Sequence, residues 1–276
     1  MSSHLVCLSF DFDAMSGFVA RGMTTPTSIS RGEFGAVGVE RLLRLFSQRD
    51  IRATWFVPGV VIGTYTDLCR QIAAGGHEIG HHGWTHATPA SMSREQERDA
   101  LLRGNEAIES ITGSPAAGYR SPAWDLSPHT VPLLLEQDFV YESSMMGHDY
   151  LPYFARHGDV IPDDAPMQFG PETSLIELPV SWTLDDHPHF EFVVNSRGIM
   201  PGLRDANSVL SNWLDDYRYM CRMQEWGVIT YTCHPYVIGR GHRMMMLERL
   251  IDTLADEGAT FVTMSEAARL FRERQA

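Results

Sequence analysis

Short apolar runs of strand length alternate along the chain with longer segments of helical periodicity. The runs that we expect to be strands are Leu5–Phe10, Ala53–Val57, Glu78–Gly80, Gly118–Arg120, Phe139–Tyr141, Ile176–Val180, Val228–Thr232 and Thr260–Thr263. The expected helices lie near Ala36–Arg49, Tyr65–Ala74, Arg94–Ile111, Pro128–Glu136, Ala206–Trp226, Met244–Asp256 and Glu266–Arg274. Repetition of strand and helix supplies the crossover connections that parallel strands require. The pattern therefore predicts an α/β fold built on a parallel sheet.

The chain shows no internal repeat and no shift of composition that would mark a domain boundary. Its 276 residues are enough for one α/β barrel of ordinary size. We therefore expect a single domain over residues 1–276.

Residues from about 143 to 204 depart from the alternation of strands and helices. The region has little helical periodicity and contains the prolines Pro152, Pro162, Pro166, Pro171, Pro179, Pro188 and Pro201. Long segments of this kind inside a compact domain are usually functional loops. We expect an elaborate loop region, interrupted by one strand, that forms a wall on the substrate side.

The formal net charge of −13 bears on the partners and the location of the protein. Nucleic acids and anionic membranes attract basic patches, so neither is an expected partner. No apolar run approaches the ~18 residues of a membrane span, and residues 1–4 lack the cationic start of a secretory signal. Four scattered cysteines without paired spacing suit a reducing compartment. We therefore expect a cytoplasmic protein.

Two pairs of polar residues indicate the chemistry. Asp11 and Asp13 are two apart at the end of the first apolar run, so on a strand both carboxylates face one side. His82 and His86 are four apart, the spacing that brings two imidazoles to one side of a helical turn. Two histidines and one carboxylate form a ligand set for a catalytic Zn²⁺ ion, and the second carboxylate is then free to act as a base. The alternative is that the aspartates only cap the strand and the histidines are structural.

Two further predicted strands end in residues suited to catalysis. Arg120 precedes an extended Ser–Pro segment, and its guanidinium fork can orient a carboxylate through two parallel hydrogen bonds. His234 titrates in the range that suits a general acid for a departing nitrogen. Its neighbour Cys233 cannot form a nucleophilic pair with it, because adjacent strand residues point to opposite faces.

Aromatic and acidic residues in and beside the proline-rich region are candidates for contacts to substrate. Trp124 and Trp182 can wall a pocket, although a buried core position is the commoner fate of tryptophan. Glu142 and the neighbouring pair Asp185 and Asp186 can contact substrate, orient a histidine, or simply be solvated.

The order of these motifs resembles the polysaccharide deacetylase (NodB-homology) family. The motifs are Phe10-Asp11-Phe12-Asp13, His82-x-x-x-His86, Arg120-Ser121-Pro122-x-Trp124, Tyr141-Glu142-Ser143-Ser144 and His234-Pro235. They extend from residue 8 to about residue 236, so the resemblance covers most of the chain. The resemblance implies a distorted (β/α) barrel of about seven parallel strands.

The resemblance also implies a role for each motif residue. A divalent metal, expected to be Zn²⁺, is held by Asp13, His82 and His86. Asp11 is the general base, Arg120 is its orienting partner, and His234 is the general acid.

Two departures from the usual family pattern point to one branch of it. Phe12 separates two aspartates that are usually adjacent, and Glu142 stands where an aspartate is usual. Both features are similar to a branch of cyclic imide hydrolases, allantoinase-like ring hydrolases and peptidoglycan-deacetylase-like proteins. The segment Gly239-Arg240-Gly241-His242-Arg243 also resembles this branch.

We therefore expect a metal-dependent hydrolase of non-peptide carbon–nitrogen bonds that acts on a cyclic imide or a related small amide. One alternative is an N-deacetylase of N-acetylated glycans, with an N-acetyl sugar as substrate. Others are a ring hydrolase that needs no metal and a catalytically silent barrel that only binds a ligand or metal. The branch implies a homo-oligomer, with a tetramer as one form.

Overall fold

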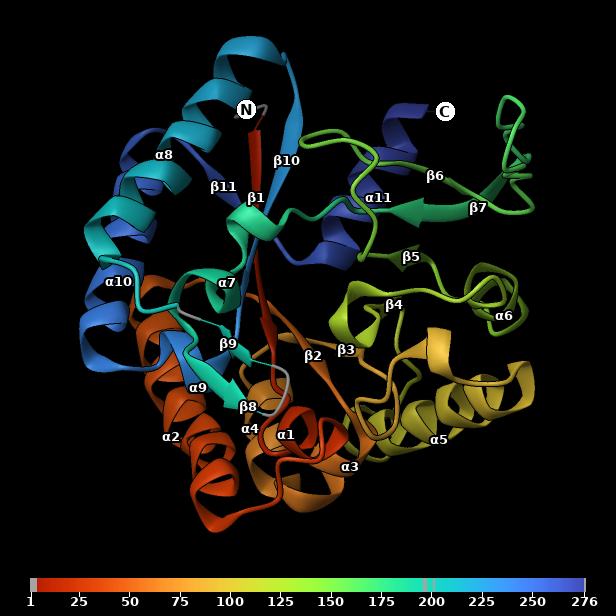
Figure 1. Ribbon diagram of the computed structural model, residues 1–276. Coiled ribbons are helices and arrows are strands. Elements are labelled where there is room, and N and C mark those ends of the chain that lie inside the picture. The colour runs from red at the N-terminus through yellow and green to blue at the C-terminus, as the bar shows by residue number, and fades with distance from the viewer. Residues whose placement is uncertain (1–3, 196–197, 201, 276) are drawn as a thin grey trace.

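A curled, mostly parallel sheet forms the centre of the molecule (Figure 1). The computed structural model describes residues 4–195, 198–200 and 202–275. In these ranges the strands follow the order β10-β1-β2-β3-β4-β5-β7-β6, and the first seven of them are parallel to their neighbours. At the end of this order β6 is antiparallel to β7, and off this path β11 pairs in parallel with Leu5 and Val6 of β1. The prediction of a distorted barrel with a parallel sheet is confirmed.

Two long strands lie side by side in this sheet, β1 (His4–Asp11) and β10 (Gly227–Cys233). The other strands are β2 (Thr54–Val57), β3 (Glu78–His81), β4 (Gly118–Tyr119), β5 (Tyr141–Glu142), β6 (Tyr153–Arg156), β7 (Glu172–Glu177) and β11 (Thr260–Phe261). A separate hairpin is formed by β8 (Val193–Asn195) and β9 (Gly198–Met200).

Helices surround the sheet (Figure 1). They are α1 (Ser16–Ala20), α2 (Pro26–Arg49), α3 (Gly59–Thr64), α4 (Thr66–Ala74), α5 (Arg94–Thr112), α6 (Thr130–Glu136), α7 (Asp186–Phe190), α8 (Ala206–Met223), α9 (Pro235–Ile238), α10 (Gly241–Asp256) and α11 (Met264–Gln275). Short 3₁₀ turns are η1 (Pro89–Ser91), η2 (Pro122–Trp124) and η3 (Trp182–Leu184). The larger hydrophobic core lies between the helices and the outer face of the sheet, and a smaller one lies under α11.

The short helices α1, α3 and α9 were not predicted, and two larger regions differ from the sequence prediction. Helix α2 begins at Pro26, ten residues before the predicted start, where Thr25 caps it and proline occupies the first turn. The proline-rich region contains four strands and α7 instead of one strand. Pro152 and Pro171 directly precede β6 and β7, a position in which a strand tolerates proline. Pro201 lies outside the described residues.

In the described part of the chain, no helix combines the length and the apolar character that crossing a bilayer requires.

Helix α2 packs closely against α9, the short helix that follows β10. Substitution of a glycine at this contact tests how close the packing is. A Cβ atom at Gly38 would lie only 2.1 Å from the carbonyl oxygen of Pro235. We expect Gly38→Ala to lower the free energy of unfolding by about 1–3 kcal/mol, because the added methyl group overpacks this crossing. Thermal and denaturant unfolding of the purified variant measure the change.

The matched control is Gly63→Ala in α3, where a Cβ would meet nothing within 4 Å. This change is expected to be neutral or to stabilise the helix by up to about 1 kcal/mol. Equal stability of the two variants would contradict the close approach at Gly38.

Candidate active site

The end of β1 and the turn that follows it bring two carboxylates to one cavity. Leu5 and Cys7 point into the smaller core inside the curled sheet, whereas Val6 and Leu8 point into the outer core. Asp11 continues the inner series at the carboxyl end of the strand. Asp13 follows in a turn that the Ser16 backbone N–H and hydroxyl fix by donating to its carbonyl oxygen, at 2.9 and 2.7 Å. Both carboxylates line the same pocket.

His82 and His86 follow β3 in a loop, not in a helix. Gly83 and His86 have positive φ angles of 71° and 62°, so the chain reverses between the two histidines. The spacing therefore brings the imidazoles together through a loop, and the helical explanation of it was wrong. His81 is structural, because its Nε2 lies 3.0 Å from the Leu101 carbonyl oxygen and its Nδ1 accepts from the Gly83 N–H.

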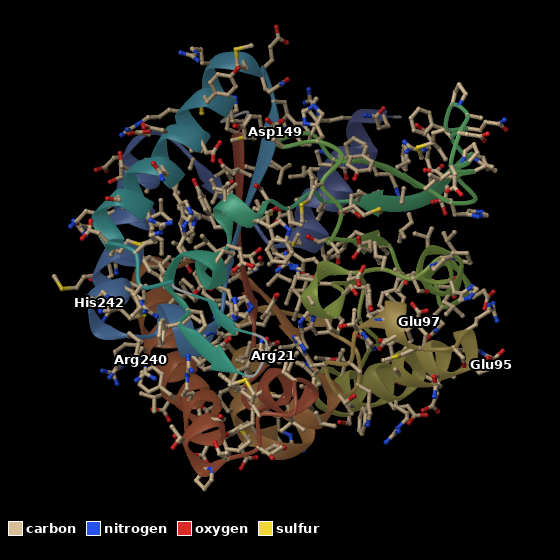
Figure 2. All side chains as sticks on the ribbon, in the orientation of Figure 1. Arg21, Glu95, Glu97, Asp149, Arg240 and His242 are labelled. Atoms are coloured by element: carbon tan, nitrogen blue, oxygen red, sulfur yellow. The ribbon has the colours of Figure 1, made fainter. Side chains whose placement is uncertain are left out.

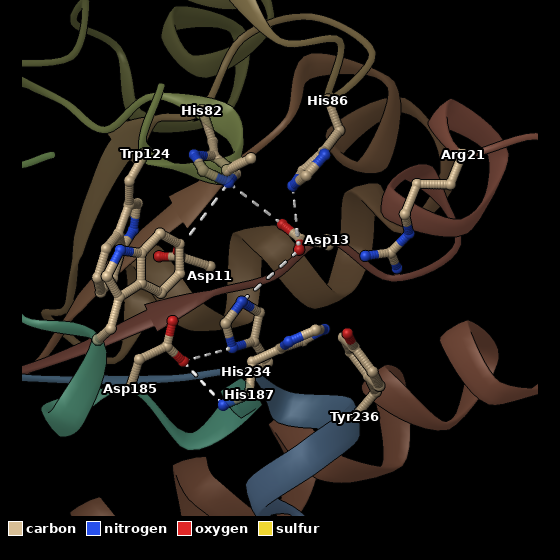
Figure 3. Close-up of a pocket in the computed structure, with 12 residues that line it drawn as sticks. Asp11, Asp13, Arg21, His82, His86, Trp124, Asp185, His187, His234 and Tyr236 are labelled. Carbon is tan, nitrogen blue, oxygen red and sulfur yellow. Dashed lines mark hydrogen bonds and ion pairs between the residues drawn. The ribbon is translucent and has the colours of Figure 1, made fainter. Parts of the chain in front are cut away.

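Asp13, His82 and His86 form a set of ligand atoms that all lie within 4.8 Å of one another (Figure 3). Asp13 Oδ1 is 3.4 Å from His82 Nε2, and Asp13 Oδ2 is 3.2 Å from His86 Nε2. Burial alone would raise the pKa of Asp13, but His86 and His82 lower it well below its usual range. The carboxylate is therefore ionised, as a metal ligand must be.

Two observations show that this donor set fits a divalent cation. Asp13 Oδ1 is buried and has no hydrogen-bond partner among the described residues. His82 Nδ1 lies 2.8 Å from the Arg120 carbonyl oxygen, so Nδ1 carries a proton and Nε2 is the ring atom that faces Asp13. A backbone carbonyl behind a histidine in this way is the usual support of a metal-binding imidazole.

Arg120 is the side chain that orients Asp11. It is fully buried, and its Nη1 donates to Asp11 Oδ1 at 2.8 Å and to Ser9 Oγ at 2.9 Å. Its Nε donates instead to the Ser143 carbonyl oxygen at 3.0 Å. The predicted two-bond fork on one carboxylate was therefore wrong. The guanidinium divides its hydrogen bonds between β1 and the segment after β5.

His234 lies at the end of β10 with Asp186 behind it. Its Nδ1 donates to Asp186 Oδ1 at 2.8 Å, and its backbone N–H donates to Asp186 Oδ2 at 3.0 Å. Burial would lower the pKa of His234, but the charges of Asp185 and Asp186 outweigh it and raise this pKa to about 10. The imidazole therefore carries a proton at neutral pH. Its Nε2 faces the pocket, 3.9 Å from Asp13 Oδ2.

These contacts correct the expectation that Asp186 binds substrate. Both of its oxygens are occupied by His234, and the side chain is fully buried outside the pocket lining. Asp186 is the carboxylate that orients the histidine. Cys233, as expected, points away into the outer core.

Glu142 is a second correction, because it is fully buried and does not line the pocket. The Ser144 hydroxyl and backbone N–H both donate to it. Glu177 packs beside it and accepts from the Met145 N–H at 2.9 Å. Burial raises the pKa of both carboxyls, and the charge of Glu142 raises that of Glu177 further. The pair supports the turn that contacts Arg120 and has no contact with the pocket.

The pocket has a volume of about 150 Å³ and an aromatic wall. Trp124 and Trp182 stack there with ring centroids 4.3 Å apart, which places both predicted wall residues at the site. Sequence reasoning missed Arg21, His187 and Tyr236, which also line the pocket. Tyr236 follows His234 by two residues and His187 follows Asp186, so proximity to these residues was an available signal. Arg21 gave no such signal.

Comparison with known proteins gives the family. A family profile described as polysaccharide deacetylase matches residues 32–140. A peptidoglycan deacetylase from Helicobacter pylori is 36% identical over 98% of this chain and 97% of its own length. A peptidoglycan deacetylase-like protein from Gibberella zeae is 29% identical over 96% of this chain and 86% of its own.

Solved structures agree. A structure described as a polysaccharide deacetylase from Mycobacterium smegmatis has a TM-score of 0.83 and 32% identity, covering 99% of this chain and 91% of that one. The PuuE allantoinase, at 20% identity, shares the fold with a TM-score of 0.79 over 97% of this chain and 90% of its own. The protein is a hydrolase that acts on carbon–nitrogen bonds other than peptide bonds. The chain belongs to the polysaccharide deacetylase family.

The ligand set predicts how metal content responds to substitution. Asp13→Ala and His86→Ala each remove one of three donors, so both variants should lose zinc affinity by roughly tenfold or more and lose activity with it. Metal analysis after equilibration at a fixed free zinc concentration measures the loss.

Asp11→Asn is the matched control, because it removes a neighbouring carboxylate that is not in the ligand set. It should keep its zinc while turnover falls by roughly 10²- to 10⁴-fold, the usual contribution of a general base. Full turnover by this variant would contradict the role of Asp11, and full zinc content in Asp13→Ala would contradict the ligand set.

The hydrogen bonds between Asp186 and His234 predict a positioning effect. Asp186→Asn replaces one accepting oxygen by an NH₂ group that faces an N–H donor of His234. Losing a charged hydrogen bond of this kind costs about 1.5–3 kcal/mol, so we expect kcat to fall by roughly 10- to 150-fold. Steady-state kinetics at saturating substrate test this.

Asp185→Asn provides the comparison at the neighbouring carboxyl, which lies 3.5 Å from His234 Nδ1 and accepts from the His187 N–H. Its effect on kcat should be smaller. A larger effect would show that Asp185 is the orienting residue.

Proposed function

We propose that this protein is a divalent-metal-dependent N-deacetylase of N-acetylated glycans. The observation that carries the proposal is the convergence of the ligand set, the Arg120-supported Asp11 and the protonated His234 on one cavity. The choice of a glycan is supported by the peptidoglycan deacetylase relatives, which match nearly the whole chain. These relatives favour the glycan over the cyclic imide that the sequence led us to expect.

In this mechanism the chain positions a water molecule and two proton-transfer groups around the scissile amide. Asp13, His82 and His86 would hold the metal, expected to be Zn²⁺, which when bound polarises a carbonyl and acidifies water. Asp11 accepts a proton from the attacking water, while Arg120 keeps its carboxylate facing the cavity. His234 enters the reaction protonated and donates its Nε2 proton to the departing nitrogen. Asp186 stabilises the imidazolium and fixes the ring.

The size of the cavity favours a second candidate, hydrolysis of a cyclic imide or a related small amide. A volume of about 150 Å³ beside the stacked rings of Trp124 and Trp182 suits a small planar ring as well as an acetamido group. The same base and acid would serve ring opening, so the two candidates differ only in what binds around the reacting amide.

A side-by-side assay of the zinc-loaded protein separates these candidates. The substrates are an N-acetylglucosamine oligomer, followed by acetate release, and a simple cyclic imide, followed by ring opening. We expect acetate release that a chelator abolishes and added zinc restores.

Ring opening without acetate release would establish the second candidate instead. Turnover that survives the chelator would indicate a ring hydrolase that needs no metal. Bound zinc with no turnover on either substrate would favour a catalytically silent barrel.

The cytoplasmic location and the homo-oligomer, with a tetramer as one form, stay predictions that cell fractionation and size-exclusion chromatography with light scattering can test.

A further inference from the structure

Arg21 and Tyr236 line the active-site cavity but have no role in the mechanism above. In Figure 3 they lie on the side of the pocket away from Trp124, and the Arg21 side chain extends from the end of α1 toward Asp13. In the view of Figure 2, Arg21 lies toward the middle of the molecule, whereas Glu95 and His242 lie at its periphery. The cavity therefore has an aromatic side and a cationic side.

The charge of Arg21 is not neutralised by the protein. Within the described residues, its guanidinium forms no ion pair. It lies over the face of Phe18, at 5.3 Å from Cζ to the ring centroid, and it also interacts with the Tyr236 hydroxyl. A Cβ built on Gly17 would lie 3.6 Å from Asp13 Oδ2 and 3.8 Å from Arg21 Nη2. Arg21 thus lies next to the ligand set. The oxygens of Asp13, however, face His82 and His86.

Tyr236 adds a hydroxyl beside this guanidinium (Figure 3). Burial raises its pKa well above the usual range, so the phenol keeps its proton. The edge of the Phe18 ring packs against the Tyr236 ring at 5.4 Å, which holds the phenol in place. The guanidinium can only donate hydrogen bonds, and the phenol has a proton to donate, so a ligand group that meets both should be an acceptor.

A carboxylate matches these donors best. Arginine binds carboxylates with charge-assisted hydrogen bonds, and its planar fork can engage both oxygens. Arg21 is exposed, so its guanidinium is open to a ligand that enters the cavity. The large excess of acidic residues would repel an acidic substrate from most of the surface, so a local cation is required to hold one.

We propose that Arg21 and Tyr236 form a carboxylate-binding subsite, so that the preferred substrate is an N-acetylated amino sugar with a carboxylate-bearing substituent next to its acetamido group. This inference rests on the proposed deacetylase function for the identity of the reacting bond. The subsite itself depends only on the donors and their position beside Asp13.

N-acetylglucosamine and N-acetylmuramic acid form a matched pair of probes, because they differ only by a lactyl ether that places a carboxylate beside the acetamido carbon. The experiment measures kcat/KM for oligomers rich in each sugar with zinc-loaded wild type, Arg21→Gln and Arg21→Lys. We expect wild type to prefer the carboxylated sugar. Arg21→Gln should lower the ratio of the two kcat/KM values by roughly 10- to 100-fold, and Arg21→Lys should retain part of the preference.

The control variant is Arg70→Gln, which removes the same charge from the exposed face of α4, where Arg70 pairs with Asp67 at 3.3 Å. It should keep the wild-type ratio. A wild-type ratio near one, or an unchanged ratio in Arg21→Gln, would overturn the subsite.

Binding separates failure of the subsite from failure of the deacetylase function. Calorimetric titration of each zinc-loaded protein with N-acetylmuramic acid and with N-acetylglucosamine needs no turnover. If neither sugar is deacetylated but Arg21→Gln weakens binding of the carboxylated sugar tenfold, the proposed function fails and the subsite stands. Any titration in which Arg21 makes no difference to binding of the carboxylated sugar overturns the subsite, whether or not the sugars react.

Discussion

The buried guanidinium of Arg120 is the interaction on which the site depends. A buried cation costs several kcal/mol unless it is paired and fully hydrogen-bonded, and Arg120 meets this condition through Asp11, Ser9 and Ser143. It also lies over the ring of Phe56, 4.3 Å from the centroid. The carbonyl group of the same residue fixes the His82 ring. One residue therefore orients both the proposed base, Asp11, and the proposed metal ligand, His82, and its loss would leave the Asp11 charge buried without a partner.

Features that depend on local geometry could be predicted from the sequence. A strand has a period of two, so the position of Asp11 in an apolar run was enough to place its carboxylate inside the sheet. The same rule placed Cys233 in the core, opposite to the face of His234. The same reasoning gave a wrong backbone conformation for His82 and His86. A helical turn and a loop can both bring two residues that are four apart to the same side. The positive φ angles that select the loop depend on packing that no spacing encodes.

Contacts between distant segments could not be predicted in the same way. Asp186 and His234 are 48 residues apart, and nothing in either motif distinguishes Asp186 from Glu142 as the partner. The two acids differ only in what surrounds them once folded, since Glu142 meets a second buried carboxyl and Asp186 meets an imidazole. Arg21 is a similar case. A short helix and a turn bring Arg21 to the pocket. No pattern around this arginine in the sequence predicts that it lies there.

The pairing of β1 with β10 has a consequence for how the protein is made. Ser9 and Thr232 are 223 residues apart in sequence, yet their hydroxyls are 3.2 Å apart, and the strand ends beside them carry Asp11 and His234. Pairing over such a separation is slow, because a long loop must close before the contact stabilises the chain. During synthesis, β1 leaves the ribosome first and has to wait for most of the chain before its neighbour arrives. His234, the proposed acid, therefore joins the site after Asp11, Asp13, His82 and His86, and an amino-terminal fragment that ends before β10 cannot complete the site.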